Sequence, residues 1–257
     1  MFFSDFKSKK KNNKTERDLT RTLHKNMSFQ AKEQYKMLRA NLAFVLPEPT
    51  PGKAAVIGIT SPDRNEGKST TSINLSYVLA EDGKKVLLVD ADLRLPSIAK
   101  KLGLRKSPGL TNMLKDSNEN AIIESEIQPG WHMLFSGSTP PNPSELLGSE
   151  RMEKLVNIFS KDYDYIVLDL PPVNIVSDAL TVARMLSGII VVVRENSTEK
   201  REFEACVRRL ELANIKILGC VLNGVTSNST FYSKYNKYRY KYSYRYGKSF
   251  SSDSIDK

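Results

Sequence analysis

Six short, continuously apolar runs alternate with helical segments through the middle of the chain, and this alternation restricts the fold most strongly. The runs occupy residues 54–60, 85–90, 131–135, 165–169, 188–193 and 216–222, and helices are predicted at 68–81, 144–159 and 198–213. Strands that are apolar throughout are buried on both faces. Because helices separate them, we expect an α/β fold with a doubly wound, mostly parallel sheet flanked by helices. Ligands bind such sheets beyond the carboxyl ends of the strands.

The charge divides the chain into a neutral body and two basic ends. We predict a basic, flexible N-terminal segment at 1–27, one domain at 28–227 and a tyrosine-rich tail at 228–257. Of the net charge of +10, each end segment carries +5, whereas the 24 basic and 24 acidic residues of 28–227 cancel. A neutral body disfavours a nucleic-acid groove built into the fold.

The body begins with a predicted helix. Ser28 can cap it, and Tyr35, Leu38, Leu42 and Val45 recur at the spacing of one helical face. The proline-rich stretch 47–52 ends the helix and leads into the first strand.

The composition argues against several other classes of protein. Two cysteines, Cys206 and Cys220, cannot build a disulfide scaffold, and two histidines disfavour a histidine-built metal site. No apolar run approaches the roughly 20 residues that cross a bilayer. The first residues place their basic side chains after the apolar ones, so we expect no signal peptide.

The loop after the first strand has the features of a phosphate-binding loop. It runs from Ser61 and contains Gly67-Lys68-Ser69 immediately before a predicted helix. Backbone N–H groups at that helix start would face phosphate oxygens. In such loops the lysine reaches the β- and γ-phosphates, and the hydroxyl binds Mg²⁺. We therefore predict that Glu66, Gly67, Lys68, Ser69 and Thr70 bind ATP, although Pro62 occupies the place of the usual first glycine.

Acidic residues end two of the predicted strands. Asp90 and Asp92 end the second strand, followed by Arg94, and Asp169 ends the strand at 165–169. Carboxylates at the carboxyl ends of neighbouring parallel strands can converge on one Mg²⁺, an ion that prefers oxygen ligands.

Together these motifs resemble the bacterial tyrosine kinases of capsule and exopolysaccharide systems, which are related to the ParA/MinD P-loop ATPases. The resemblance runs from Ser28 to the C-terminus. Residues 67–69 match the family's Walker A motif, 89–94 its Walker A′ motif and 166–172 its Walker B motif, and 140–147 its proline-rich segment. Asp63 stands where ParA/MinD ATPases carry a signature lysine, which favours the kinase branch.

The resemblance implies autophosphorylation of the tail on a neighbouring subunit. The predicted acceptors are the clustered tail tyrosines, Tyr232, Tyr235, Tyr238, Tyr240, Tyr242, Tyr244 and Tyr246. Lys68 would bind the phosphates, whereas Ser69, Asp90 and Asp169 would hold Mg²⁺, the last two through water. Asp92 would take the proton of the acceptor phenol, and Asn223 would contact adenine.

The resemblance also implies an assembly. Glu33, Lys36 and Arg39 match the family's oligomerisation motif, with lysine in place of the middle arginine, and imply a homo-oligomeric ring, an octamer. A transmembrane activator of the polysaccharide co-polymerase type and a cognate tyrosine phosphatase are the implied partners. The implied localisation is cytoplasmic, peripheral at the inner face of the cell membrane, with a role in regulating capsule or exopolysaccharide synthesis and export.

Two other readings account for part of the sequence. A ParA/MinD-type ATPase without protein kinase activity would use the same phosphate loop and carboxylates. A nucleic-acid binder would use the Tyr/Lys/Arg tail for stacking and phosphate contacts, but we expect no nucleic-acid partner.

Overall fold

The apolar runs form the strands of one sheet in the computed structural model, which describes residues 27–46, 50–115 and 120–225. Within these ranges seven strands lie in the order β3-β4-β2-β5-β1-β6-β7. Their bounds are β1 Ala55–Thr60, β2 Val86–Asp90, β3 Ile123–Glu124, β4 Trp131–Leu134, β5 Tyr165–Asp169, β6 Gly188–Arg194 and β7 Ile217–Asn223. Every neighbouring pair is parallel except β3 with β4. The predicted α/β fold with a mostly parallel sheet is therefore confirmed.

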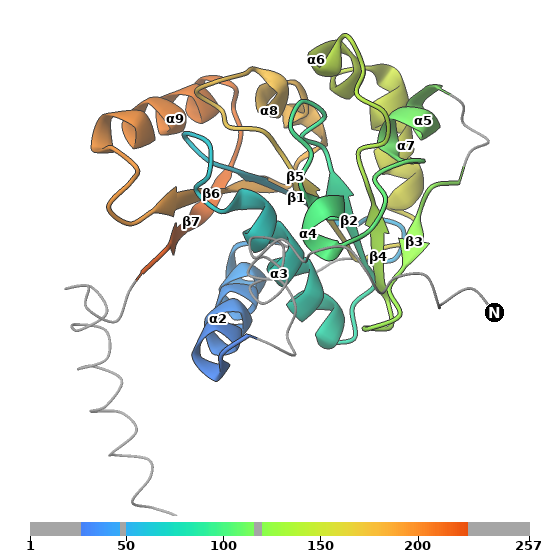
Figure 1. Ribbon diagram of the computed structural model, residues 1–257, viewed down its shortest axis with the longest axis horizontal. Coiled ribbons are helices and arrows are strands. Elements are labelled where there is room, and N and C mark those ends of the chain that lie inside the picture. The colour runs from blue at the N-terminus through green and yellow to red at the C-terminus, as the bar shows by residue number, and fades with distance from the viewer. Residues whose placement is uncertain (1–26, 47–49, 116–119, 226–257) are drawn as a thin grey trace, which may run out of the picture.

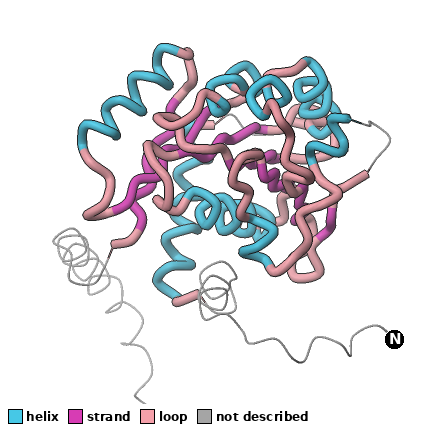
Figure 2. The backbone as a smooth tube through the Cα atoms, turned by 45° about the horizontal axis from the view of Figure 1, so that its top comes forward, coloured by secondary structure: helices cyan, strands magenta, loops and turns pink. Residues whose placement is uncertain are grey.

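Helices cover both faces of this sheet (Figures 1 and 2). Helices α2 (Phe29–Val45), α3 (Lys68–Glu81) and α4 (Ile98–Leu102) contribute to one apolar cluster. The opposite cluster receives side chains from α5 (Leu110–Lys115), α6 (Pro143–Leu147), α7 (Glu150–Phe159), α8 (Asp178–Thr181) and α9 (Lys200–Leu212). A short 3₁₀ helix, η1 (Ala183–Met185), precedes β6.

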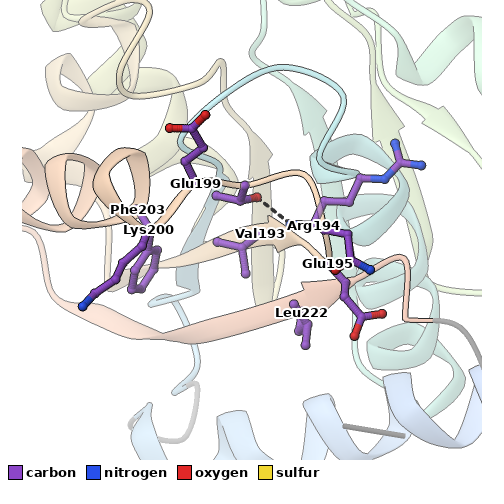
Figure 3. A pocket seen from close by; sticks show the side chains of 9 residues that line it. Val193, Arg194, Glu195, Glu199, Lys200, Phe203 and Leu222 are labelled. Carbon is purple, nitrogen blue, oxygen red and sulfur yellow. Dashed lines mark hydrogen bonds between the residues drawn. The ribbon is translucent and has the colours of Figure 1, made fainter. Parts of the chain in front are cut away.

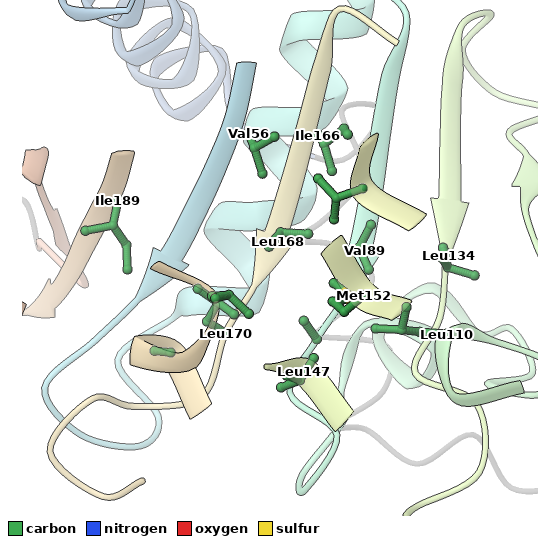
Figure 4. Packing of buried hydrophobic residues seen from close by; sticks show 14 of the residues in the cluster. Val56, Val89, Leu110, Leu134, Leu147, Met152, Ile166, Leu168, Leu170 and Ile189 are labelled. Carbon is green, nitrogen blue, oxygen red and sulfur yellow. The ribbon is translucent and has the colours of Figure 1, made fainter. Parts of the chain in front are cut away.

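The central strands are buried along their whole length because both clusters pack against them. Every residue of β1, β2 and β5 is buried. Along β1, Val56 faces the cluster drawn in Figure 4 and Ile57 faces the opposite one, as the two-residue period of a strand requires. This double burial accounts for the continuous apolar runs in the sequence.

The prediction of one helix at 144–159 is wrong, because the segment forms two helices. Helix α6 ends at Leu147, and α7 begins at Glu150. Ser149 lies between them in an extended conformation, and its hydroxyl accepts a hydrogen bond from the Met152 N–H (3.2 Å). This N-cap starts a new helix where the apolar pattern alone predicts continuity.

The predicted first helix is present as α2, with Ser28 as its cap. The Ser28 hydroxyl accepts a hydrogen bond from the Ala31 N–H (3.2 Å), and Leu42 is buried against the cluster that α3 also joins. Among the described residues no helix is both long enough and apolar enough to span a membrane. The two predicted end segments fall outside the described ranges, apart from Met27.

Candidate active site

The loop between β1 and α3 exposes the start of a helix. Gly67 precedes α3 with φ of +104°, and no side chain caps the helix. A Cβ at this position would lie 1.9 Å from the Asn223 side-chain nitrogen, so both the backbone conformation and the space require glycine. Lys68 follows at the first helical position and is 8% exposed. The loop thus has uncapped amides and a cation, the two elements of a phosphate site.

Glu66 stabilises this loop through hydrogen bonds of its buried side chain. Its buried carboxylate accepts hydrogen bonds from the Asp63 N–H (3.1 Å) and from the Thr198 hydroxyl. Its carbonyl accepts a hydrogen bond from the side-chain amide of Asn223 (2.8 Å). Arg194 adds a contact to the carbonyl of Asn65 (3.2 Å). The Glu66 side chain therefore shapes the loop, and Asn223 lies directly against it.

Asp90 and Asp169 are register partners at the ends of β2 and β5. Their exposed fractions are 1% and 0%. Asp169 Oδ1 accepts a hydrogen bond from the Ser72 hydroxyl (3.0 Å), and Asp90 Oδ2 accepts one from the Ile98 N–H (3.1 Å). The second oxygen of each carboxylate is buried and has no hydrogen-bond partner among the described residues.

The pKa values of both carboxyl groups are raised. Burial raises the pKa of Asp169 to about 6, with the charge of Lys68 opposing the rise. Burial and the charge of Asp169 raise the pKa of Asp90 well above its usual value. Two buried carboxylates side by side disfavour double ionisation, and a bound cation would remove that penalty.

The donor set fits Mg²⁺, which binds one or two carboxylates and completes its shell with phosphate oxygens and water. The two oxygens of Asp90 and Asp169 that lack hydrogen bonds are suitable ligands. In the described ranges no group of three or more His, Cys, Asp or Glu side chains is arranged to hold a metal. Ser69, whose hydroxyl lies 2.8 Å from the Ser97 hydroxyl, supplies another oxygen at the helix start.

Asp92 lies in the turn that follows β2. It is 7% exposed, and its Oδ1 accepts a hydrogen bond from the Leu95 N–H (3.0 Å). Arg94, between them, donates to the buried carboxylate of Asp178 through Nε (2.9 Å) and Nη2 (3.1 Å). The Asp92 carboxylate is thus held at the carboxyl end of β2, next to the position of Asp90.

A hollow of about 350 Å³ lies beside the loop, between the ends of β6 and β7 and the start of α9 (Figure 3). Arg194, Phe203 and Leu222 contribute to its lining, together with Thr198. Its lining does not include Lys68, Asp90 or Asp169. It borders the bracing contacts of Glu66 and is not the phosphate site itself.

Comparisons with known proteins assign the chain to a protein family. An AAA domain model matches residues 55–200. Tyrosine-protein kinase YwqD of Bacillus subtilis is 35% identical over 209 residues, which cover 81% of this chain and 85% of that protein. The chain belongs to the bacterial tyrosine-protein kinases.

Solved structures agree with this assignment. The chimerical protein CapA2B2 superposes with a TM-score of 0.73 at 31% identity, covering 81% of this chain and 90% of the other. The cell division ATPase MinD of Pyrococcus furiosus has a TM-score of 0.55 at 24% identity, covering 66% and 71%, and shares the fold. Several other curated relatives are longer, and this tyrosine kinase spans about 28% of their length. The predicted enzyme class, protein-tyrosine kinase, is confirmed by the family.

The structure brings most of the predicted site residues of this kinase to one end of the sheet. They are Glu66, Gly67, Lys68, Ser69, Thr70, Asp90, Asp92, Asp169 and Asn223. Ser72, Ser97 and Thr198 form hydrogen bonds with three of them, and Asp178 binds the neighbouring Arg94; no motif in the sequence marks these four residues. Only Ser72 carries a signal, because it lies one helical turn after Lys68.

The predicted oligomerisation residues lie on α2, away from the phosphate loop. Lys36 pairs with Glu33 on the same helix (3.0 Å). Arg39 donates to the Val78 carbonyl (2.8 Å) and pairs with Asp82 (3.3 Å), both belonging to α3 and its C-terminal cap. The Arg39 contacts hold α2 against α3 of the same chain, and the role of these residues in oligomerisation stays a prediction. The seven tail tyrosines, 232–246, lie outside the described residues.

Proposed function

We propose that this tyrosine kinase transfers the γ-phosphoryl group of ATP, with Mg²⁺, to tyrosines 232–246 in the C-terminal segment of a neighbouring copy. The observation that carries the proposal is the Asp90–Asp169 pair. Two buried carboxylates lie beside a lysine-bearing phosphate loop, and within the part of the chain that the structure describes each keeps one oxygen without a hydrogen bond. Such a pair lowers the stability of the fold unless a cation occupies it.

The loop residues position the nucleotide. Lys68 and the free amides at the start of α3 bind the β- and γ-phosphates, while Ser69, Asp90 and Asp169 hold Mg²⁺. Bound Mg²⁺ supplies charge neutralisation for the phosphates. Because phosphoryl transfer depends chiefly on positioning and electrostatics, a rigid loop braced by Glu66 suits the reaction.

Asp92 receives the phenolic proton of the acceptor tyrosine. A free phenol has a pKa near 10 and is protonated at neutral pH, so it needs a base within hydrogen-bond reach. The turn after β2 places a carboxylate at the same sheet end as Asp90. Asn223, which lies against the loop, contacts the base of the nucleotide.

Phosphorylation reverses the charge of the tail. Residues 228–257 carry a net charge of +5. Each phosphate adds about −1.5 to −2 charges, so four phosphates more than cancel it. We infer that the basic tail enters the acidic site of the adjacent subunit in an octameric ring, in which Glu33, Lys36 and Arg39 take part. Phosphorylation then releases the tail and loosens the ring.

The assembly would work at the cytoplasmic face of the cell membrane through a transmembrane activator, with a tyrosine phosphatase resetting it. There it would regulate capsule or exopolysaccharide synthesis and export. The similarity to the chimerical protein CapA2B2 supports a second polypeptide as a partner of the kinase. The basic stretch 7–14 would add attraction to anionic lipid, about 1 kcal/mol per basic residue near the surface.

The decisive experiment separates donor from acceptor. A Lys68→Met chain serves as tagged acceptor, and a chain with its seven tail tyrosines changed to phenylalanine serves as kinase. With MgATP and a cytoplasmic fragment of an activator present, phosphotyrosine on the tagged chain demonstrates transfer between copies. ATP hydrolysis without phosphotyrosine would instead support the ParA/MinD-type ATPase.

A second experiment tests the ring. Light scattering before and after ATP should show a fall in molar mass as the tail is phosphorylated. A ring that keeps its mass with fully phosphorylated tyrosines would contradict the release step and leave the kinase activity itself unaffected.

A further inference from the structure

An ion-pair cluster around one buried carboxylate lies next to the turn that carries Asp92. Asp178, at the first position of α8, is 0% exposed and accepts both Arg94 hydrogen bonds. The Ser144 hydroxyl of α6 donates to Oδ1 of the same carboxylate and also lies 3.1 Å from Arg94 Nη2. Three elements that are distant in sequence therefore meet at one buried carboxylate.

The cluster holds the turn after β2 through residues that belong to other elements. Leu93 is 1% exposed within the apolar core, and Asp92 Oδ1 accepts the Leu95 N–H. Arg94 lies between these two anchors and extends away from the strand to α8. Because the planar guanidinium donates two hydrogen bonds to the oxygens of one carboxylate, its orientation is fixed, and this restricts the backbone of the turn at Arg94.

Ser144, the serine of this cluster, lies on helix α6. It forms within the proline-rich segment 140–147 and starts with Pro143 at its first position. Gly148, just after it, packs so closely that a Cβ there would lie 3.2 Å from the Thr181 side chain of α8. The close approach of α6 to α8 allows a short side chain such as serine to reach Asp178.

We propose that Asp178 and Ser144 are positioning residues for tyrosine phosphorylation, which hold Arg94 and thereby keep Asp92 directed at the acceptor phenol. The proposal rests on the function proposed above, in which Asp92 is the base. The proposal also assigns a structural role to the proline-rich segment, because α6 contributes Ser144, one of the two residues that hold Arg94.

Asp178→Asn tests the proposal, since it keeps the shape and removes the charge. We expect kcat for phosphotyrosine formation to fall about 100-fold, the size of effect that a misplaced catalytic group produces. The affinity for MgADP should stay within about twofold. The double variant Asp92→Asn with Asp178→Asn should lose no more activity than Asp92→Asn alone, because the second residue acts only through the first.

Ser144 supplies a milder pair of variants that keep the ion pair. Ser144→Ala should lower kcat about tenfold, whereas Ser144→Thr, which retains a hydroxyl, should restore most of it. Arg151→Ala is the matched control, because Arg151 also ties two elements together, through the Leu114 carbonyl (3.0 Å), but lies away from the site. It should leave kcat unchanged.

The outcomes distinguish the two proposals. If the wild-type kinase forms no phosphotyrosine, the proposed function fails and the positioning role fails with it. If the wild type is active and Asp178→Asn and Ser144→Ala match it, only the positioning role is overturned. Additive losses in the double variant, or a loss of MgADP affinity equal to the loss of kcat, would also overturn it. If Asp178→Asn does not fold, the Ser144 pair decides.

Discussion

The carboxyl and amino ends of the sheet differ in how fully their buried polar atoms are hydrogen-bonded. At the carboxyl end, Asp90 and Asp169 each keep one buried oxygen without a hydrogen bond. At the amino end, the Trp131 indole donates to the Ser76 hydroxyl (2.9 Å), and His132 shares a 2.7 Å hydrogen bond with Tyr163. A buried polar group left unpaired costs about 1–3 kcal/mol. Glu81, also at the amino end, keeps one buried oxygen without a partner among the described residues, but its other oxygen pairs with Lys32 (2.7 Å). The carboxyl end differs because two such carboxylates are register partners there, which lowers the stability of the fold until a cation binds.

If this contrast is correct, substitutions at the carboxyl end should change activity most. Lys68→Met should reduce phosphotyrosine formation about 100-fold or more, the size of effect seen when one preorganised charge-stabilising group is removed. Lys154→Met, at an exposed position of α7, is the control and should leave the rate unchanged. Initial rates measured with an anti-phosphotyrosine readout check this. Equal rates for both variants would remove Lys68 from the phosphate site.

The carboxyl end should also become more stable when its charge is removed. Because the pKa of Asp169 is about 6 when folded and near 3.8 when unfolded, folding favours the protonated form. Stability therefore rises as pH falls from above 6 toward 4. Asp169→Asn should abolish activity, yet raise the unfolding free energy of the metal-free protein at pH 7.5 by about 2 kcal/mol. Urea unfolding in EDTA at pH 7.5 and 5 measures this gain.

The gain in Asp169→Asn should shrink at pH 5, where the wild-type carboxyl group is largely protonated. Part of the gain at pH 7.5 is offset because Lys68 loses a counter-charge. A variant less stable than the wild type at both pH values would show that the buried pair contributes to stability, and would weaken the contrast between the two ends.

At the amino end, the reverse pattern is expected. Ser76→Ala leaves the Trp131 N–H, on a side chain that is 1% exposed, without its acceptor. The unfolding free energy should fall by about 1–2 kcal/mol while the phosphorylation rate stays unchanged. Ser160→Ala is the control, because the Ser160 hydroxyl donates a local hydrogen bond to the Val156 carbonyl in the preceding helical turn (2.8 Å). A loss of activity in Ser76→Ala would couple the two ends.

The sequence predicts the carboxyl end well for a physical reason. Parallel strands align their ends, so aspartates that close two neighbouring strands, Asp90 and Asp169, must come together. Gly67 is likewise predictable, since the turn into α3 requires positive φ. Local patterns therefore place the residues that strand ends and helix starts carry.

Contacts between distant segments are not predictable in the same way. Arg94 and Asp178 are 84 residues apart, and no periodicity links them. The division of 144–159 at Ser149 depends on one side-chain cap within an apolar pattern that favours a continuous helix. Glu66 lies in the predicted loop and accepts the nearby Asp63 N–H, but its hydrogen bond with Thr198 joins residues 132 positions apart and is not predictable. The contacts of Asp178 and Thr198 depend on how distant segments pack, which a pattern of residue types does not record, whereas the Ser149 cap is a local signal within that apolar pattern.

The smallest predicted effect is a pH dependence at the amino end that opposes that of Asp169. Burial lowers the pKa of His132 below its usual value, with Glu124 opposing and Lys85 adding to the shift. The folded state therefore disfavours the protonated ring, and the stability associated with His132 is lost as pH falls below about 6.5 through the folded pKa. His132→Gln should lose less unfolding free energy than the wild type between pH 7 and 5. Comparing the two curves cancels the contribution of the carboxylates, and parallel curves would show that His132 does not contribute.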